Sequence, residues 1–309
     1  MRTALLFCCM VLAGVLAASA PVGAATRTTF TALDVPGADS TEVHGVIRVG
    51  VLLQYVEVVG FFHDPHGTHG FVWSRGRFTT LNYPGAANTW TMGLNRTGQI
   101  VGYYAGADGV VRGFVSTAGN YTTITCPLNV GRGPANVAPN AINDAGTIVG
   151  DFGPAGFAFT AGECVFPIRQ DAIYINAINN NGLAAATIVN ENNAIHGQTL
   201  MPLATNDNPL QIDVPGALAT WATGVNDTSQ VVGYYQTGTR LISTVRGFIL
   251  SNSVFATLQY PGAFSTEPFA IDTPTAPTGA YDIVGFYGGR SGAHHGFIAT
   301  LSPQVVSLP

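Results

Sequence analysis

The fold of this chain is decided by residues 78–116, which read F-T-T-L-N-Y-P-G-A-A-N-T-W-T-M-G-L-N-R-T-G-Q-I-V-G-Y-Y-A-G-A-D-G-V-V-R-G-F-V-S. Four short runs in it are rich in β-branched and aromatic residues: Phe78–Pro84, Trp90–Asn95, Gln99–Tyr104 and Val110–Val115. Asn95 and Gly98 suit the start and end of a tight turn, because asparagine starts a type I turn and glycine accepts a positive φ. The stretch therefore predicts a small twisted antiparallel sheet.

This pattern recurs along almost the whole chain with a period of roughly 40–50 residues. Pro-Gly-Ala returns at 36–38, 84–86, 215–217 and 261–263, and Gly-Phe returns at 70–71, 113–114, 156–157, 247–248 and 296–297. Four-stranded sheets repeated at such a period are typical of β-propellers. Six repeats therefore predict an all-β fold, a six-bladed β-propeller of four-stranded antiparallel blades, in a single domain over residues 26–309. A β-solenoid would need a shorter repeat, and two sandwiches would not repeat one hairpin pattern.

The repeats also predict the centre of the ring and its closure. The innermost strands should begin near residues 42, 90, 138, 175, 221 and 267. Small residues should lie on these strands where the ring is narrow, at Gly93, Ala141, Ala177, Gly224 and Ala270. Thr29–Pro36 has the pattern of an outermost strand with no sheet before it, so we expect it to close the ring beside the strand near His295–Thr300. The tail Gln304–Pro309 would then be displaced or add a further edge.

Residues 1–25 have the features of a secretory signal peptide. Arg2 supplies the positive charge, Ala4–Ala17 the apolar core, and residues 22–24 the small side chains before a cleavage site. The alternative is a transmembrane anchor, but the apolar core is shorter than the roughly 20 residues that a span needs. We therefore expect a secreted protein, extracellular or periplasmic, with no stable membrane insertion after signal removal.

Composition and missing motifs exclude several functions. Only 9% of the residues are charged, the 12 basic residues are all arginine, and the net charge is −5. This balance argues against nucleic acid as a partner, because phosphates attract basic surfaces. The chain has no G-x-S-x-G elbow, H-E-x-x-H, phosphate-binding loop or C-x-x-C pair, so no cofactor is expected and no catalytic residue can be assigned.

Two cysteines follow the signal peptide, Cys126 and Cys164. Export makes a disulfide the obvious expectation, but the strand pattern argues against one. Both cysteines fall on outermost strands of consecutive blades, at offsets that place their side chains on equivalent faces. Because neighbouring blades meet through opposite faces and outer strands splay apart, the sequence predicts no disulfide.

The recurring units resemble the bacterial extracellular repeat family called HAF. The matching residues are His69-Gly70-Phe71, His295-Gly296-Phe297, the Pro-Gly-Ala steps and the G-x-N-x-x-G-x-I-V-G-Y-Y run at 93–104. The resemblance covers roughly residues 30–301 and implies secretion and a repeat β fold. It implies no catalytic residues.

The densest cluster of possible metal ligands is His63, Asp64, His66 and His69. Imidazole suits zinc, copper or nickel. However, the second unit has a plain hairpin loop in the same place, Ala105–Arg112, and His69 begins a repeated tripeptide. We therefore interpret the cluster as a hairpin loop, with no metal site.

Two tryptophans, Trp90 and Trp221, lie at the same offset after Pro84 and Pro215. They should begin the inner strands of blades that lie opposite each other. Exposed aromatic rings form stacking platforms for sugars. The alternative is that both rings pack between blades.

Loop lengths predict which face of the ring would hold a ligand. The Pro-Gly-Ala links should emerge together with the loops at 62–69, 104–111, 235–245 and 287–294. This face should also carry His63, His66 and His294, and His294 could approach either of the other two across the junction of the sixth and first blades. Variable loops on a rigid scaffold are where binding usually resides, although these histidines could equally be solvated loop residues. The opposite face, with its short N-x-x-G turns, should offer little to hold a ligand.

These observations favour a secreted, non-catalytic binding or surface-interaction module whose ligand is a glycan or a protein. A secreted hydrolase or lyase acting at the channel mouth is one alternative, and a purely structural extracellular protein is another. An enzyme should gather ionisable side chains with shifted pKa values at one mouth. A binding module should gather aromatic and amide side chains there instead.

Overall fold

The computed structural model describes residues 26–50, 54–126, 137–153, 155–166, 172–204, 208–239, 243–274, 279–289 and 292–303. The expected signal peptide at 1–25 and the tail Gln304–Pro309 lie outside the described residues. Within the described ranges, no helix is long and apolar enough to cross a membrane.

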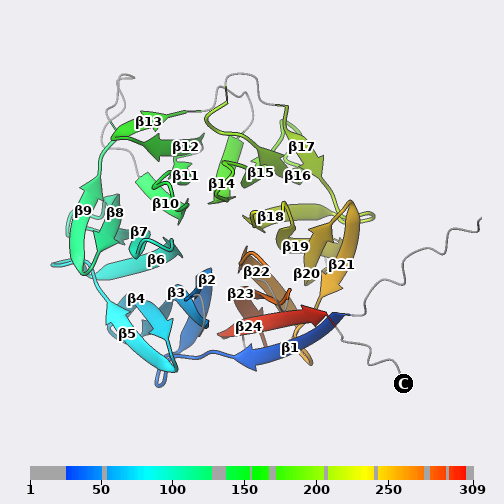
Figure 1. Cartoon of the computed structure of the whole chain (residues 1–309), viewed down its shortest axis with the longest axis horizontal. Helices are drawn as coiled ribbons and strands as arrows, with labels where there is room; N and C mark the ends of the chain where they lie inside the picture. The colour runs from blue at the N-terminus through cyan, green and yellow to red at the C-terminus, as the bar shows by residue number, and fades with distance from the viewer. Residues whose placement is uncertain are drawn as a thin grey trace, which may run out of the picture.

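The chain folds as an all-β propeller of four-stranded antiparallel blades around a central axis (Figure 1). Four blades are separate sheets. The first two contain β2 (Ser40–Val49), β3 (Tyr55–Asp64), β4 (Gly67–Ser74) and β5 (Arg77–Leu81), then β6 (Asn88–Leu94), β7 (Gln99–Ala105), β8 (Val111–Thr117) and β9 (Asn120–Ile124). The next two contain β10 (Val137–Ile142), β11 (Ile148–Phe152), β12 (Ala155–Thr160) and β13 (Glu163–Val165), then β14 (Ala172–Ile178), β15 (Ala184–Val189), β16 (Ile195–Leu200) and β17 (Leu210–Ile212).

The other eight strands form one sheet made of two antiparallel sets. One set contains β18 (Ala219–Val225), β19 (Val231–Gly238), β20 (Ser243–Ser251) and β21 (Val254–Leu258). The other contains β22 (Ser265–Ile271), β23 (Tyr281–Gly288), β24 (His294–Pro303) and β1 (Thr26–Ala32). A single parallel residue pair, Val245 with Ser265, joins the two sets.

The innermost strands confirm the predicted repeat. They begin at residues 40, 88, 137, 172, 219 and 265, each within three residues of its expected start. Each strand also has a register shift at the same place, which leaves one bulged residue: His44, Met92, Asn140, Asn176, Thr223 or Phe269. A bulge bends a strand and redirects a side chain, so these six residues form one layer around the channel.

The small residue after each bulge lies where neighbouring innermost strands approach most closely. A Cβ atom at Gly93 would lie 2.9 Å from the Ala141 Cα, and one at Gly224 would lie 3.0 Å from the Ala270 Cα. Real Cβ atoms avoid such contacts with backbone, so only a small residue fits. The expectation of small residues at the narrow part of the ring is therefore confirmed.

The first strand closes the ring as predicted. β1 pairs with β24 from Thr26 opposite Pro303 to Ala32 opposite Phe297. The Phe30 ring packs edge-on against Phe297, with ring centroids 5.8 Å apart, and against Tyr260 at 5.2 Å. The outer strand of the last set thus comes from the beginning of the chain.

The prediction of free cysteines is wrong, because Cys126 and Cys164 form a disulfide with Cα atoms 5.5 Å apart. Strand alternation does not control Cys126, which lies beyond the end of β9. Its side chain packs instead against a core cluster that includes Val137 and Phe157 of the following blade. Because Cys126 lies in the link, its side chain can turn toward β13, and the argument from alternating strand faces does not apply.

Replacing Cys126 and Cys164 together by serine is expected to lower the free energy of unfolding by about 2–3 kcal/mol, because the disulfide limits the entropy of the unfolded chain. The bond spans 38 residues. Thermal unfolding with and without reductant measures the effect, and peptide mass spectrometry of the unreduced protein checks the bond. A protein with two free thiols would contradict the structure.

Candidate functional site

The central channel is narrowed by an aliphatic collar. Six equivalent residues, one from each innermost strand, form it: Val46, Leu94, Ile142, Ile178, Val225 and Ile271. Each is only 5–8% exposed. The collar lines two cavities of about 90 Å³ each, one toward each end of the channel. The channel therefore has two chemically separate mouths.

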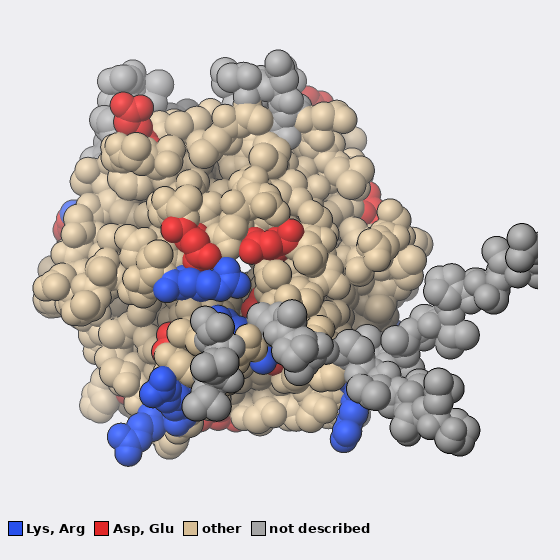
Figure 2. Space-filling view, in the orientation of Figure 1, with Lys and Arg blue, Asp and Glu red and all other residues tan. Residues whose placement is uncertain are grey.

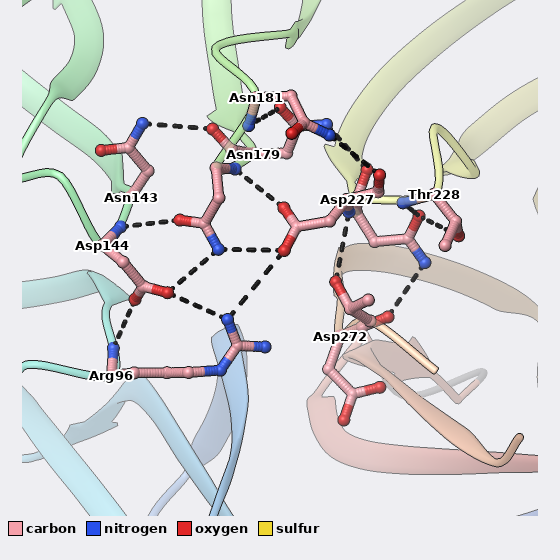
Figure 3. A network of polar contacts seen from close by, with 11 residues as sticks. Arg96, Asn143, Asp144, Asn179, Asn181, Asp227, Thr228 and Asp272 are labelled. Carbon is pink, nitrogen blue, oxygen red and sulfur yellow. Dashed lines mark hydrogen bonds and ion pairs between the residues drawn. The ribbon is translucent and has the colours of Figure 1, made fainter. Parts of the chain in front are cut away.

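The first mouth, which we call the Asn mouth, is surrounded by the N-x-x-G turns. In three of these turns, and in the N-D-T-S turn at 226–229, the first asparagine donates from Nδ2 to a main-chain oxygen of the next blade. Figure 3 shows part of this belt. Asn95 donates to Asn143, Asn143 to Asn179, Asn179 to Asn226, and Asn226 to Asp272, with lengths of 2.8–3.1 Å. The belt links neighbouring blades through buried amides, so the repeated asparagine has a structural role.

A second polar belt lies on the surface around the first. Asp144 accepts from the Arg96 amide and pairs with its guanidinium at 2.9 Å, while the Asn180 amide bridges Asp144 at 3.0 Å and Asp227 at 2.9 Å. Figure 2 shows acidic side chains and an arginine gathered at the middle of this face. The turns surround a cavity of about 90 Å³, and the expectation that this face holds little ligand stays a prediction. Its polar side chains are nevertheless largely bonded to one another.

The opposite end of the channel, which we call the Glu42 mouth, gathers ionisable and aromatic side chains. Glu42, Trp90, Trp221 and Glu267 occupy equivalent positions, two residues before the bulge, on β2, β6, β18 and β22. Directly opposite them on the second strands lie Phe61, Tyr103, Tyr234 and Phe286. All four innermost positions are half-buried and are followed by a buried residue, as expected for side chains that border a channel.

The two tryptophans lie in matching aromatic pairs. Trp90 stacks on Tyr103 with ring centroids 5.0 Å apart, and Trp221 stacks on Tyr234 at 4.9 Å. Strands β6 and β18, which carry the tryptophans, lie on opposite sides of the axis (Figure 1). The mouth therefore has two similar aromatic walls.

The two tyrosines also show that side chains from several blades converge here. Burial, with the charges of Glu42 and Asp151, raises the pKa of Tyr103 to about 12. Burial, with the charges of Glu267 and Glu42, raises the pKa of Tyr234 well above its usual value. Glu42 thus acts on tyrosines of two different blades.

Glu42 is held by two histidines. Its Oε2 lies 3.2 Å from the His44 Nε2, and its Oε1 lies 2.7 Å from the His294 Nδ1. Burial alone would raise the pKa of Glu42, but the hydrogen bonds and charges of His44 and His294 outweigh burial and hold the pKa below its usual value. Glu42 is therefore an ionised carboxylate at neutral pH.

Glu267 behaves in the opposite way. Burial, reinforced by the negative charge of Glu42, raises the pKa of Glu267 to about 7, despite the opposing charge of His294. Asp151 on β11 is similar, because burial raises its pKa to about 7 against its hydrogen bonds from Asn140 and the Ile175 amide. The mouth thus combines an ionised carboxylate with carboxyls that titrate near neutrality.

Glu267 predicts a pH-dependent stability. Its folded pKa of about 7 is above the unfolded value of 4.5, so the folded protein retains a proton that the unfolded chain releases. The stabilisation is complete below about pH 4.5 and is lost as pH rises through 7. In Glu267→Gln, the difference in unfolding free energy between pH 5 and pH 8 should shrink by at most about 3 kcal/mol. Equal pH dependence in urea titrations of both proteins would contradict this.

The three histidines expected at the ligand face have different hydrogen-bond partners. His294 contacts Glu42 and stacks on Phe286, with ring centroids 4.1 Å apart. His63 bonds Thr68 at 2.9 Å, and the His66 amide donates to Asp64. His294 thus belongs to the Glu42 mouth through its contact with Glu42 of β2, and its approach to His63 or His66 stays a prediction.

Sequence reasoning missed Glu42 and Glu267, although a signal was present. Glu42 follows Pro36 by six residues and Glu267 follows Pro261 by six, which is the offset of Trp90 after Pro84. Aligning the link prolines would have placed the two glutamates beside the two tryptophans.

Comparison with known proteins concerns the fold. No protein-family model and no curated protein matches this chain. A crystal structure of a protein of unknown function from Dyadobacter fermentans DSM 18053 matches with a TM-score of 0.57 and 10% identity, over 90% of this chain and 99% of that chain. A gluconolactonase from Xanthomonas campestris matches with a TM-score of 0.48 and 13% identity, over 85% and 88%. A fungal fucose-binding lectin from Aleuria aurantia, described as a six-bladed β-propeller, matches with a TM-score of 0.43 and 12% identity, over 84% and 91%.

Proposed function

We propose that this chain is an exported six-bladed propeller of the HAF-repeat type that binds a carbohydrate at the Glu42 mouth. Four blades are separate sheets, so the count of six requires that the eight-stranded sheet is two blades. Its two halves share only one parallel residue pair, and each half has its own bulged innermost strand. An experimental structure with one continuous eight-stranded blade would overturn that count. Export rests on residues 1–25, and the mass of the protein recovered outside the cell tests it.

The observation that supports carbohydrate binding is the pair of matching aromatic walls, Trp90 on Tyr103 and Trp221 on Tyr234. Aromatic rings contact the apolar faces of sugars while polar groups between them bind hydroxyls. The required polar groups are present, because Glu42 and Glu267 lie at the same level as the tryptophans. The amides of Asn140 and Asn176 line the cavity behind.

Replacing Trp90 and Trp221 together by alanine should weaken binding of an array-identified oligosaccharide at least tenfold, because both walls are lost. Affinity is measured by calorimetry on the purified wild-type and variant proteins. The matched control is Trp73→Ala, since Trp73 packs in the core at the outer part of a blade. Unchanged affinity in the double variant, or an equal loss in the control, would reject this site.

One observation favours hydrolysis as a second candidate function. Glu42 and Glu267 are neighbouring carboxyl groups whose environments move their pKa values in opposite directions, as in sites where one group donates a proton and the other accepts one. In hydrolysis of a glycosidic bond, Glu267 would protonate the departing oxygen and Glu42 would accept a proton from the attacking water. Product formation from the bound oligosaccharide, abolished in Glu267→Gln, would support this function, whereas tight binding without turnover would exclude it.

A further inference from the structure

A polar side-chain pair recurs on the outer part of the propeller. In three units, the residue before the Gly-Phe or Gly-Gln step faces the residue two places before a link proline. His69 bonds Asn82 at 3.2 Å, His196 bonds Asp213 at 3.0 Å, and His295 bonds Asp34 at 3.1 Å. These pairs link the third strand of a blade to the segment that follows its outermost strand.

The other three units lack this pair, and the fifth unit is one of them. Arg246 and Gln259 occupy the two positions there, and neither makes the usual contact. The Gln259 Nε2 donates to the Ala263 oxygen at 3.1 Å, while its Oε1 is buried without a hydrogen-bond partner among the described residues. A buried polar atom without a partner costs about 1–3 kcal/mol, so an external partner at this atom would be favourable.

Arg246 is similarly unpaired. Its equivalent in the second repeat, Arg112, holds Asp108 through two contacts of 2.5 and 2.9 Å. No carboxylate lies within salt-bridge distance of Arg246 in the described part of the chain, and the residue is exposed. The guanidinium is therefore available to an anion from solution.

A cavity of about 470 Å³ lies between these two side chains and the next link, lined by Thr244, Arg246, Thr257, Gln259, Ala263 and Phe264. Phe264 is 59% exposed. It is the residue after Pro-Gly-Ala, where the other three such links have Asp39, Ala87 and Leu218. Only this link therefore provides an aromatic ring beside an unpaired arginine.

We propose that this cavity, which we call the Arg246 pocket, binds a saccharide bearing a carboxylate, that is, a uronic acid residue. The exposed Phe264 ring provides a face for the apolar side of a sugar. The Arg246 guanidinium provides paired donors for a carboxylate. The buried Gln259 oxygen requires a donor, which a sugar hydroxyl supplies once the side-chain amide turns toward the cavity and which a fully ionised anion does not. The volume is within the range of small-ligand sites.

The Arg246 pocket does not depend on the Glu42 mouth. It lies at the junction of β20, β21 and the link before β22, whereas the mouth is built by the innermost strands. The two sites share no lining residue. The two proposals can therefore fail separately.

The test uses the full exported chain titrated with glucuronate, galacturonate and their neutral parents, glucose and galactose, with saturation-transfer NMR as the readout. Both uronates should bind at least tenfold more tightly than the neutral sugars. Arg246→Gln should remove this preference, and Phe264→Ala should weaken binding of the uronates at least tenfold. Both residues are exposed, so the variants should retain the wild-type melting temperature.

Two controls make the result decisive. Leu218→Ala changes the same link position at another junction, where Leu218 is 51% exposed, and should leave uronate binding unchanged. The double replacement of Trp90 and Trp221 by alanine should also leave it unchanged. Absence of uronate binding, equal affinity for neutral sugars, or loss of binding in either control would overturn the proposal for the Arg246 pocket. Loss of uronate binding in the Trp90 and Trp221 double variant would place the binding at the Glu42 mouth instead.

Discussion

Deleting residues 26–32, and with them β1, should lower the free energy of unfolding by at least about 4 kcal/mol. The reason is that Phe30 loses its packing on Tyr260 and Phe297, and removal of this half-buried ring alone costs about 2 kcal/mol. The deletion also strips β24 of seven paired residues and exposes its edge. At roughly 2–4 °C per kcal/mol for a protein of this size, the melting temperature should fall by about 10 °C or more.

Two point variants test whether the loss of stability comes from opening the ring and not from the shorter chain. Phe30→Ala should reproduce part of the effect, about 2 kcal/mol, since Phe30 is half-buried. Thr28→Ala, at an exposed position on the same strand, should change stability by less than about 0.5 kcal/mol. A deletion variant that melts at the wild-type temperature would show that β1 does not close the ring.

Replacing Arg48 by methionine should be the most destabilising single substitution among the charged residues. Arg48 lies near the end of β2 and binds Asp272, with Nε 3.2 Å from Oδ2, and also Asp282. The two aspartate side chains are only 1% and 2% exposed. Removing the partner of buried charges costs about 3–5 kcal/mol, because the carboxylates lose their counter-charge without gaining water.

The pH dependence of this variant identifies the cause. Burial raises the pKa of Asp272 to about 7, so its folded form keeps a proton as pH falls below 7. The cost of losing Arg48 should therefore be smaller at pH 5 than at pH 8, where Asp272 is ionised. Arg96→Met is the matched control, since its guanidinium pairs with Asp144 at the surface, and it should cost less than about 1 kcal/mol. Equal losses for both variants would contradict the account.

Arg48 and β1 act on the same junction. β1 pairs with β24 and leads into β2, and Arg48 of β2 binds Asp272 and Asp282 of the last set. The hydrogen bond between Glu42 and His294 crosses that junction at the other end of the channel. The Asn belt ends at Asp272, because the first unit has Ile47 where the others have asparagine or aspartate. Arg48, which binds Asp272 and Asp282, thus provides the link between the last and first units that the Asn belt lacks.

The fold could be predicted from sequence because each repeat gives the same local signals. Tight N-x-x-G turns and link prolines mark strand ends in several copies, so an ambiguous copy is resolved by its neighbours. Closure by Thr29–Pro36 could be predicted from the same repeats, because this segment has the pattern of an outermost strand but no sheet precedes it. The Cys126–Cys164 disulfide could not be predicted in this way, because Cys126 lies in a link where no strand alternation applies.

The site was predictable only in part. Trp90 and Trp221 were recognised as equivalent because they are the same residue, whereas Glu42 and Glu267 occupy the same repeat position with different chemistry. The contact of His294 with Glu42 depends on how the first and last units meet, which no local pattern describes. The shifted pKa values of Glu42 and Glu267 depend on burial and on neighbours from other blades, and these become visible only in three dimensions.

The most direct test of carbohydrate binding at the Glu42 mouth is a crystal structure of the protein with an oligosaccharide identified on a glycan array. We predict a sugar ring stacked on Trp90 or Trp221, with hydroxyl groups within hydrogen-bond distance of Glu42 or Glu267. An oligosaccharide bound at the Asn mouth, among Asn180, Asp144 and Asp227, with the Glu42 mouth empty, would contradict the proposed function.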